Sequence, residues 1–347
     1  MEWQLPPRRE AILKIVIDEY VNCGVPVASQ GVARLHRLGV SPATVRNELA
    51  WLKEQGFLSQ PHKSAGAVPA DHGYRYYVNS LVEEQLSPEE QRLVRHLFHQ
   101  VEMDLDEWVK LAASLLAQLS HNAAVVVPPR AVRSRIKRLH LVAVQDSVAL
   151  LVMILEEARL RQQLVSFEEE ITQEDLDLIA NKLNSEYVGL TRNRIASKGV
   201  ELTPQEKTVI QVAMAVMETE DEQGYGEPYL EGLRHLLGQP EFLSGAKMLS
   251  IVGLLEKKGL VSSMLAQGRY DQVKVVIGEE NAQDELRDLS VVVSAYGVPD
   301  EFSGAVGVVG PRRMQYSRTI SAVRLLASVL GDLAAELHGT NVTGNSK

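Results

Sequence analysis

The sequence has a single cysteine, Cys23, in a chain of 347 residues. A lone cysteine excludes an intramolecular disulfide and a cysteine-based zinc cluster, and it is typical of a reduced compartment. No stretch approaches the roughly 18 uninterrupted apolar residues that a membrane-spanning helix needs. Residues 1–10 have no apolar core and carry two prolines and two arginines, so we expect no signal peptide there. We therefore expect a cytoplasmic protein without a membrane partner.

The motifs of several common enzyme classes are also missing. There is no Gly-x-x-x-x-Gly-Lys-Ser/Thr phosphate loop, no Gly-x-Ser-x-Gly elbow and no His-Glu-x-x-His zinc motif. His96 and His99 share one helical face, but no paired carboxylate or cysteine accompanies them, so a solvated face is the preferred interpretation over a metal site. We predict that the protein is not an enzyme and uses no cofactor and no metal.

Charge is unevenly distributed along the chain. The formal net charge of −9 argues at first against a nucleic-acid partner. Residues 1–80, however, hold 9 Lys and Arg against 7 Asp and Glu, a net charge of +2, which leaves −11 for the remainder. An acidic body repels phosphate, while the first segment tolerates it. If the protein binds DNA, the first 80 residues are the place to look.

This first segment contains start and stop signals for three short helices. Pro7 begins an apolar-periodic run that Gly24 ends, and a second helix is expected within residues 26–38. Ser41 and Pro42 begin the third helix, because a serine accepts a hydrogen bond from a free amide of the first turn and proline fits the first helical position.

The third helix, residues 42–55, has an apolar stripe and a polar face. The stripe has the i, i+4, i+7 spacing of a buried face: Val45, Leu49 and Leu52. Arginine can donate two hydrogen bonds to guanine, asparagine can pair with the edge of adenine, and recognition helices read bases near their N-terminus. An ordinary amphipathic helix with a polar outer face is the alternative interpretation. The candidate base-contacting residues are Ser41, Ala43, Thr44, Arg46 and Asn47.

A hairpin is expected after this helix. Residues 57–60 and 67–69 are extended in pattern, with a tight polar loop at 62–66 between them. A hairpin after three helices is the wing of a winged helix-turn-helix, and Lys63 and Ser64 at its tip are the candidate phosphate contacts. The tyrosines that follow either pack between domains, which is the preferred interpretation, or stack on DNA: Tyr74, Tyr76 and Tyr77.

These segments resemble the HrcA family of heat-inducible repressors. The resemblance rests on SPATVRNE at 41–48, PHKSAG at 61–66 and GYRYYV at 73–78, and it extends to segments within 229–242, 277–281, 290–296 and 307–316. It implies a sequence-specific transcription repressor without catalytic activity, which binds double-stranded DNA at an inverted-repeat operator of chaperone genes as a homodimer. It also implies modulation by the GroE chaperonin and by heat.

The sequence departs from the family pattern at four positions. Ala67 and His72 stand where basic residues are frequent, and Gln30 and Gly31 stand where a basic residue and a larger side chain are common. Phosphate contacts from the wing and the second helix are therefore reduced, and Lys63 offsets part of the loss. We expect DNA binding to survive with weaker affinity or a smaller salt dependence.

Beyond residue 80 the pattern predicts an α+β multidomain chain. A helical connector spans 81–120, and valine-rich strands flank a mostly helical stretch. The resemblance implies a GAF-like α/β domain at 121–200 and 270–340, interrupted by an inserted dimerisation domain at 201–269. The elements expected within these domains are strands at 137–144, 148–155, 162–167, 272–278, 289–296 and 304–309, and helices at 172–187 and 316–337 with two more starting near 203 and 240.

A small-molecule sensor is the alternative function. In that hypothesis the GAF-like body binds a ligand in an apolar pocket with a few convergent polar groups, and the ligand shifts the DNA-binding equilibrium. Arg312 and Arg313 follow the last strand, where they either bind an anion or pair with the acidic surface. A repressor is the leading hypothesis, and the sensor is the alternative.

Overall fold

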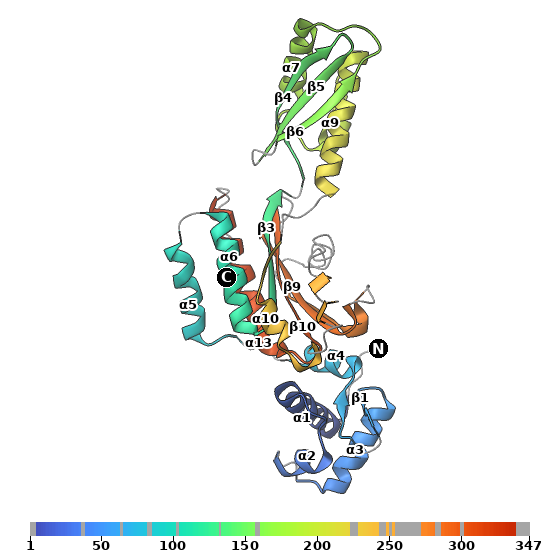
Figure 1. Cartoon of the computed structure of the whole chain (residues 1–347), viewed down its shortest axis with the longest axis vertical. Coiled ribbons are helices and arrows are strands. Elements are labelled where there is room, and N and C mark those ends of the chain that lie inside the picture. Colours follow the sequence, from blue (N-terminus) through green and yellow to red (C-terminus); the bar gives the residue numbers. More distant parts are fainter. Residues whose placement is uncertain are drawn as a thin grey trace. The chain divides into compact units, whose positions relative to one another are not determined.

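Figure 1 shows the computed structural model of the chain, whose described residues combine helices with three separate sheets. The mixed α and β composition confirms the expected α+β class. The chain divides into a first unit, made of 1–128, 227–296 and 304–347, and a second unit, made of 129–226 and 297–303. The structure describes residues 5–35, 39–62, 65–81, 85–101, 104–131, 133–156, 160–222, 228–242, 248–249, 252–253, 272–281, 286–298 and 302–337.

The N-terminal part of the first unit has three helices followed by a hairpin, as expected. Gly24 ends the first helix with a left-handed backbone, φ 67°, which glycine adopts without strain. The hairpin pairs Leu58 with Pro69, and Val27 forms an additional bridge with Ala67. The elements are α1 (Pro7–Cys23), α2 (Ser29–Leu35), α3 (Pro42–Glu54), β1 (Leu58–Ser59), β2 (Val68–Pro69) and α4 (Asp71–Asn79).

A single apolar core holds these elements together. The expected stripe of α3 is fully or almost fully buried, and it meets the buried side of α1 and Phe57 at the base of the hairpin. Burying each of these side chains away from water stabilises the fold by about 1.5–3 kcal/mol. The position of α3 is therefore set by its own buried side. The buried residues are Ile12, Leu13, Val16 and Ile17 of α1 with Val45, Leu49 and Leu52 of α3.

The rest of the first unit is built on a five-stranded sheet in the order β7-β3-β10-β9-β8. Strand β3 (Ala123–Ala131), next to β10, was not expected from the sequence, since the paired prolines at 128–129 obscure its pattern. Helices α6 and α13 pack against each other beside the sheet (Figure 1). The remaining elements are α5 (Pro88–Gln100), α6 (Leu105–Ser120), β7 (Tyr229–Glu231), α10 (Leu233–Leu237), β8 (Lys274–Ile277), β9 (Leu289–Val298), β10 (Phe302–Pro311) and α13 (Tyr316–Leu337).

The second unit has its own antiparallel sheet, in the order β4-β5-β6. One face is covered by helices, and the other carries exposed apolar side chains. The expected domain limits differ from this division, because they joined 121–200 to 270–340 and placed 201–269 in the insertion. Consecutive strands closed by short turns pair with each other, so β4–β6 form a separate sheet. The elements are β4 (Ile136–Gln145), β5 (Val148–Leu155), β6 (Leu160–Ser166), α7 (Gln173–Tyr187), α8 (Arg192–Ser197) and α9 (Pro204–Glu222).

Two sequence expectations concern long helical segments. The pattern between residues 87 and 119 corresponds to two helices, α5 and α6, and Asp104 caps the second by accepting a hydrogen bond from the Asp106 amide at 2.9 Å. The helix expected from residue 240 begins with a short 3₁₀ turn, Pro240–Phe242, and lies for the most part outside the described residues. None of the helices that the structure describes is long and apolar enough to cross a membrane.

Candidate DNA-binding interface

The N-terminus of α3 is closed by a serine cap. The Ser41 hydroxyl accepts a hydrogen bond from the Thr44 amide at 3.1 Å and lies 3.0 Å from the Thr44 hydroxyl. Pro42 occupies the first helical position, where its missing amide hydrogen costs nothing. This cap fixes the first turn of α3, so the residues that follow have a defined direction.

The face of α3 opposite its buried stripe is open to solvent. Ala43, Arg46 and Asn47 are exposed, and Thr44 is half-buried. Among the residues that the structure describes, neither the Arg46 side chain nor the Asn47 side chain makes a hydrogen bond or an ion pair. Their donors and acceptors are thus available to an external partner, and all five base-contacting candidates lie within the first two turns of α3 or at its cap.

Arg9 of α1 adds a cation beside this face that the sequence pattern did not single out. Its Nε atom donates to a carboxylate oxygen of Glu48 at 2.8 Å, and its guanidinium carbon lies 3.8 Å from the ring centroid of Trp51. Arg8 reaches the same carboxylate at 3.9 Å. Because residues 9 and 48 are far apart in the chain, no local pattern could have revealed the contact.

Gln60 connects α3 to the hairpin. Its side-chain oxygen accepts a hydrogen bond from Lys53 Nζ at 2.8 Å, and its side-chain nitrogen donates to the Ala65 carbonyl at 2.7 Å. The hairpin tip is closed by the Ala65 amide donating to the His62 carbonyl at 2.9 Å. The candidate phosphate contacts Lys63 and Ser64 lie outside the described residues.

One of the four departures from the family pattern, Ala67, faces the protein interior, whereas His72 is exposed. Ala67 is only 2% exposed and exchanges two backbone hydrogen bonds of 2.8 Å with Val27. The His72 ring packs 4.4 Å from the ring of Phe57. A long basic side chain would lose its hydration at the buried Ala67 position, which is a local reason for the small residue there.

The tyrosines of α4 pack within the protein, and of the three only Tyr74 contacts a residue outside the N-terminal part, where packing between domains was preferred from the sequence. Tyr74 is buried with its ring 5.9 Å from that of Tyr316, and burial raises its pKa well above the usual value. Tyr76 lies edge-on against Phe57 at 5.8 Å, and the Tyr77 hydroxyl donates to Asp18 at 2.5 Å. These side chains join α4 to the hairpin, to α1 and to α13.

Arg312 and Arg313 form ion pairs with acidic side chains, which was one of the two alternatives expected for them, the other being the binding of an anion. Arg312 lies 3.0 Å from Asp71 of α4, and Arg313 pairs with Glu241. Arg313 also donates to the Val21 carbonyl at the end of α1, at 3.2 Å. Both arginines therefore connect the body of the first unit to its N-terminal helices.

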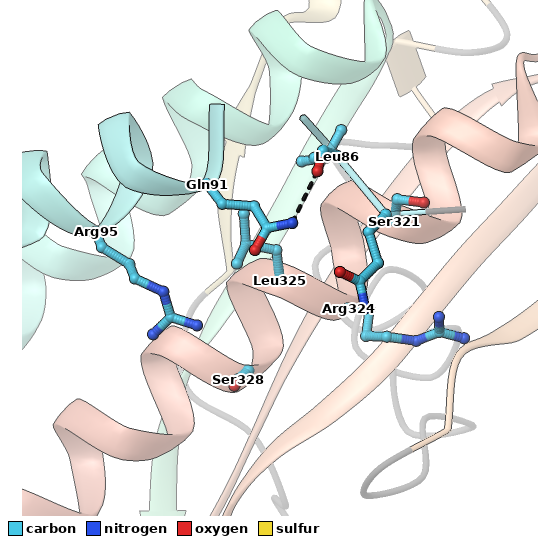
Figure 2. A pocket seen from close by; sticks show the side chains of 8 residues that line it. Leu86, Gln91, Arg95, Ser321, Arg324, Leu325 and Ser328 are labelled. Atoms are coloured by element: carbon cyan, nitrogen blue, oxygen red, sulfur yellow. Dashed lines mark hydrogen bonds between the residues drawn. The ribbon is translucent and has the colours of Figure 1, made fainter. Parts of the chain in front are cut away.

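A pocket of about 220 Å³ lies between α5, α13 and the segment before α5 (Figure 2). Gln91 donates to the Leu86 carbonyl at 2.7 Å across its edge. The lining is mixed rather than apolar, since it combines two glutamines, two arginines, two serines and two leucines. This is not the apolar pocket that the sensor hypothesis requires.

Comparison with known proteins covers nearly the whole chain. The model of a family described as "HrcA protein C terminal domain" matches residues 106–320. The heat-inducible transcription repressor HrcA of Dehalococcoides mccartyi is 43% identical over 96% of this chain and 97% of that protein. The proteins of the same name from Herpetosiphon aurantiacus and Chloroflexus aurantiacus are 40% and 39% identical, each over 98% of this chain and over 98% and 97% of their own lengths.

A solved structure has a similar fold. The crystal structure of a hypothetical protein at 2.2 Å resolution aligns with 96% of this chain and 99% of its own, with a TM-score of 0.62 and 20% sequence identity. At that identity the likeness concerns the fold.

Proposed function

The chain belongs to the HrcA family of heat-inducible transcription repressors, and from that premise we propose that residues 1–80 form a winged helix-turn-helix that inserts α3 into the major groove of DNA. The protein is a transcription repressor of heat-shock genes. In this proposal Ser41, Ala43, Thr44, Arg46 and Asn47 approach base edges, while Lys63 and Ser64 contact phosphates.

The observation that carries the proposal is the open face of α3. A recognition helix needs a buried stripe that holds it in place and, opposite, unpaired donors near its N-terminus. Val45, Leu49 and Leu52 provide the first, and Arg46 and Asn47 provide the second. An amphipathic helix with a merely solvated outer face would have the same burial, so binding to specific DNA is the property that separates the two interpretations.

A homodimer is the second part of the proposal, because an inverted repeat presents the same half-site twice with two-fold symmetry. The outer face of the β4-β5-β6 sheet supports this part. Val142 pairs with Leu150, which pairs with Leu164, and this apolar row crosses all three strands. Val142 is 47% exposed and Leu164 is 56% exposed. We assign this face to the contact with a second copy of the chain, since apolar side chains exposed in a row are typical of an interface.

The five-stranded sheet of the first unit corresponds in this proposal to a GAF-like domain, and the cytoplasm is the proposed compartment. Heat would act by depleting the dimer, because a marginally stable assembly loses its DNA-competent form as temperature rises. The GroE chaperonin would restore that form. A small-molecule sensor is not proposed, since the relatives that match nearly the whole chain are named heat-inducible transcription repressors.

Binding to two labelled DNA fragments tests the proposal directly. One fragment carries the inverted repeat found upstream of chaperone genes, and the other carries a scrambled sequence of the same composition. We expect the full-length protein to prefer the repeat by about a thousandfold or more at moderate salt, and chaperonin to strengthen this binding. Equal affinity for both fragments, with or without chaperonin, would contradict the proposed recognition by α3.

A further inference from the structure

Asp71 begins α4 and receives two hydrogen bonds from distant parts of the first unit. Its Oδ2 atom accepts from the Glu279 amide at 2.9 Å, and its Oδ1 atom accepts from Arg312 at 3.0 Å. The Asp71 side chain is 17% exposed. Both oxygens of this carboxylate are therefore directed at the body and not at solvent.

Arg75 repeats this connection one helical turn later. Its Nε atom donates to Glu280 at 2.7 Å and its Nη2 atom donates to the Val275 carbonyl at 2.7 Å. Nη2 also pairs with the second oxygen of Glu280, so the guanidinium holds the carboxylate at two points. Glu280 is itself oriented by the Ile277 amide at 2.9 Å. A planar fork of this kind fixes an angle as well as a distance.

The turn that receives Asp71 is shaped for it. Gly278 has a φ of +49°, and a Cβ atom at this position would lie 2.1 Å from Asp71 Oδ2. Glycine is therefore required for both the backbone conformation and the close approach of the carboxylate. We call this set of contacts the α4 seam; it consists of Asp71, Arg75, Val275, Gly278, Glu279, Glu280 and Arg312.

The α4 seam is directional, whereas an apolar contact could slide. Helix α4 is in turn packed against α1 and the hairpin through Phe57, Tyr76 and Tyr77. The orientation that the seam gives to α4 therefore also sets the orientation of α3, because the two helices are connected through a tightly packed core, and such cores transmit displacements. The seam joins the DNA-binding residues to the five-stranded-sheet part of the first unit.

We propose that Asp71 and Arg75 are positioning residues that hold the DNA-binding residues at one angle to the body, and so determine which separation of operator half-sites the repressor accepts. Neither residue contacts DNA. The inference rests on the proposed function, since half-site separation has meaning only for a dimer on an inverted repeat. A rigid seam restricts the dimer to operators with one separation of half-sites. A loosened seam lets the DNA-binding residues of each copy change their angle and accept other separations.

The test measures the affinity of the full-length protein for a series of operators whose half-sites are moved apart or together one base pair at a time. The ratio between the best separation and its neighbours is the readout. For Arg75→Gln we expect this ratio to fall by about tenfold, the effect of losing one charged directional contact. Affinity for a fragment with one half-site should stay as in the unchanged protein, which also verifies that the variant is folded.

Three further variants separate angle from charge. Arg75→Lys keeps the charge but loses the forked guanidinium, and Gly278→Ala displaces Asp71 without changing any charge. Both should therefore lower the ratio of affinities between the best separation and its neighbours. Arg95→Gln is the matched control, because Arg95 is exposed on α5 and outside the seam, and it should leave the ratio unchanged.

The outcomes distinguish the inference from the function on which it rests. A sharp separation preference in the unchanged protein that persists in Arg75→Gln and Gly278→Ala would overturn the role of the seam and leave the proposed function intact. An unchanged protein that binds the inverted repeat no better than a single half-site would overturn both.

Discussion

Arg46 and Asn47 are adjacent exposed residues in the second turn of α3, and their side chains carry the hydrogen-bonding groups of the candidate interface that are best suited to reading bases. A guanidinium presents a fork of donors, and a carboxamide presents a donor beside an acceptor. Both patterns match base edges in the major groove. Substitution at these positions should therefore reveal sequence recognition without disturbing the fold.

Replacing Arg46 or Asn47 with Ala should weaken binding to the operator by about 1–3 kcal/mol for each residue, if each makes a bidentate contact with a base. Binding isotherms on the operator and on a scrambled fragment measure the loss and its selectivity. Gln55→Ala, at the other end of the same helix, is the control and should bind normally. A variant with unchanged affinity and selectivity would show that the residue does not read a base.

Lys63 is expected to act differently from the residues of α3. A phosphate contact releases counterions whatever the sequence, so Lys63→Ala should weaken binding to all DNA by a similar factor and reduce the slope of log affinity against log salt by about one unit. Titrations at several salt concentrations on operator and scrambled DNA give both quantities. A loss confined to the operator would contradict the phosphate assignment.

At the scale of single elements, the same substitution has opposite consequences in two helices of the N-terminal part. Glycine within a helix normally costs about 0.5–1 kcal/mol relative to alanine. Gly31 in α2 has space, because the nearest atom to an added Cβ is a carboxylate oxygen of Glu19 at 3.9 Å. Gly73 in α4 has none, because an added Cβ would lie 2.1 Å from the Phe57 carbonyl oxygen.

Gly31→Ala should accordingly raise the free energy of unfolding by up to about 1 kcal/mol. Gly73→Ala should lower it by about 1–3 kcal/mol, because the overlap with the Phe57 backbone outweighs the gain in helix propensity. Urea denaturation monitored by circular dichroism compares the two. Equal effects of the two substitutions would show that helix propensity alone governs these positions.

The start of α5 predicts a dependence on pH. Hydrogen bonds from Arg318 and then Ser87 hold the pKa of Glu90 below its usual value. A carboxyl group with a lowered pKa stabilises the fold above its ordinary pKa, and this contribution disappears as the pH falls through the lowered value. The contribution is small, below about 1 kcal/mol, since the pair between Arg318 and Glu90 is largely solvated.

Glu90→Gln should therefore reduce the free energy of unfolding at neutral pH and lose this effect in acid, once the pH is below the lowered pKa of Glu90. Urea denaturation of both proteins at the two pH values measures the difference. Glu89→Gln is the matched control, because Glu89 is the exposed neighbour in the same first turn. A deficit in Glu90→Gln that persists at low pH would mean that packing and not charge is responsible.

At the scale of the whole molecule, the row formed by Val142, Leu150 and Leu164 predicts how two copies associate. Leu164→Asp places a charge at the β6 end of the row and should raise the dimer dissociation constant by about thirtyfold or more, the effect of an interface hot spot. Leu178→Asp is the control, since Leu178 is 69% exposed on α7 of the same unit. Sedimentation velocity over a range of concentrations measures both variants. If Leu178→Asp and not Leu164→Asp caused dissociation, the dimer interface would have to be assigned to α7 instead of the sheet.

The elements themselves could be predicted from the sequence to a large extent. The stripe of α3, the serine cap and the hairpin are local patterns, and each is found in the structure within a few residues of its expected limits. The unexpected strand β3 shows the limit of this approach. Its residues form a strand because β10 lies beside them in the sheet, and no local spacing encodes that neighbour.

The sequence by itself determined most of the longer helices, the open face of α3 and the family, because caps, periodicity and characteristic segments act over a few residues. Only the tertiary structure decided which strands share a sheet, that Ala67 faces inward, and that Asp71 and Arg75 meet Glu279 and Glu280. These partners are about 200 residues apart in the chain. Contacts of that kind depend on the free energy of the whole packed arrangement, which no local pattern of residues contains.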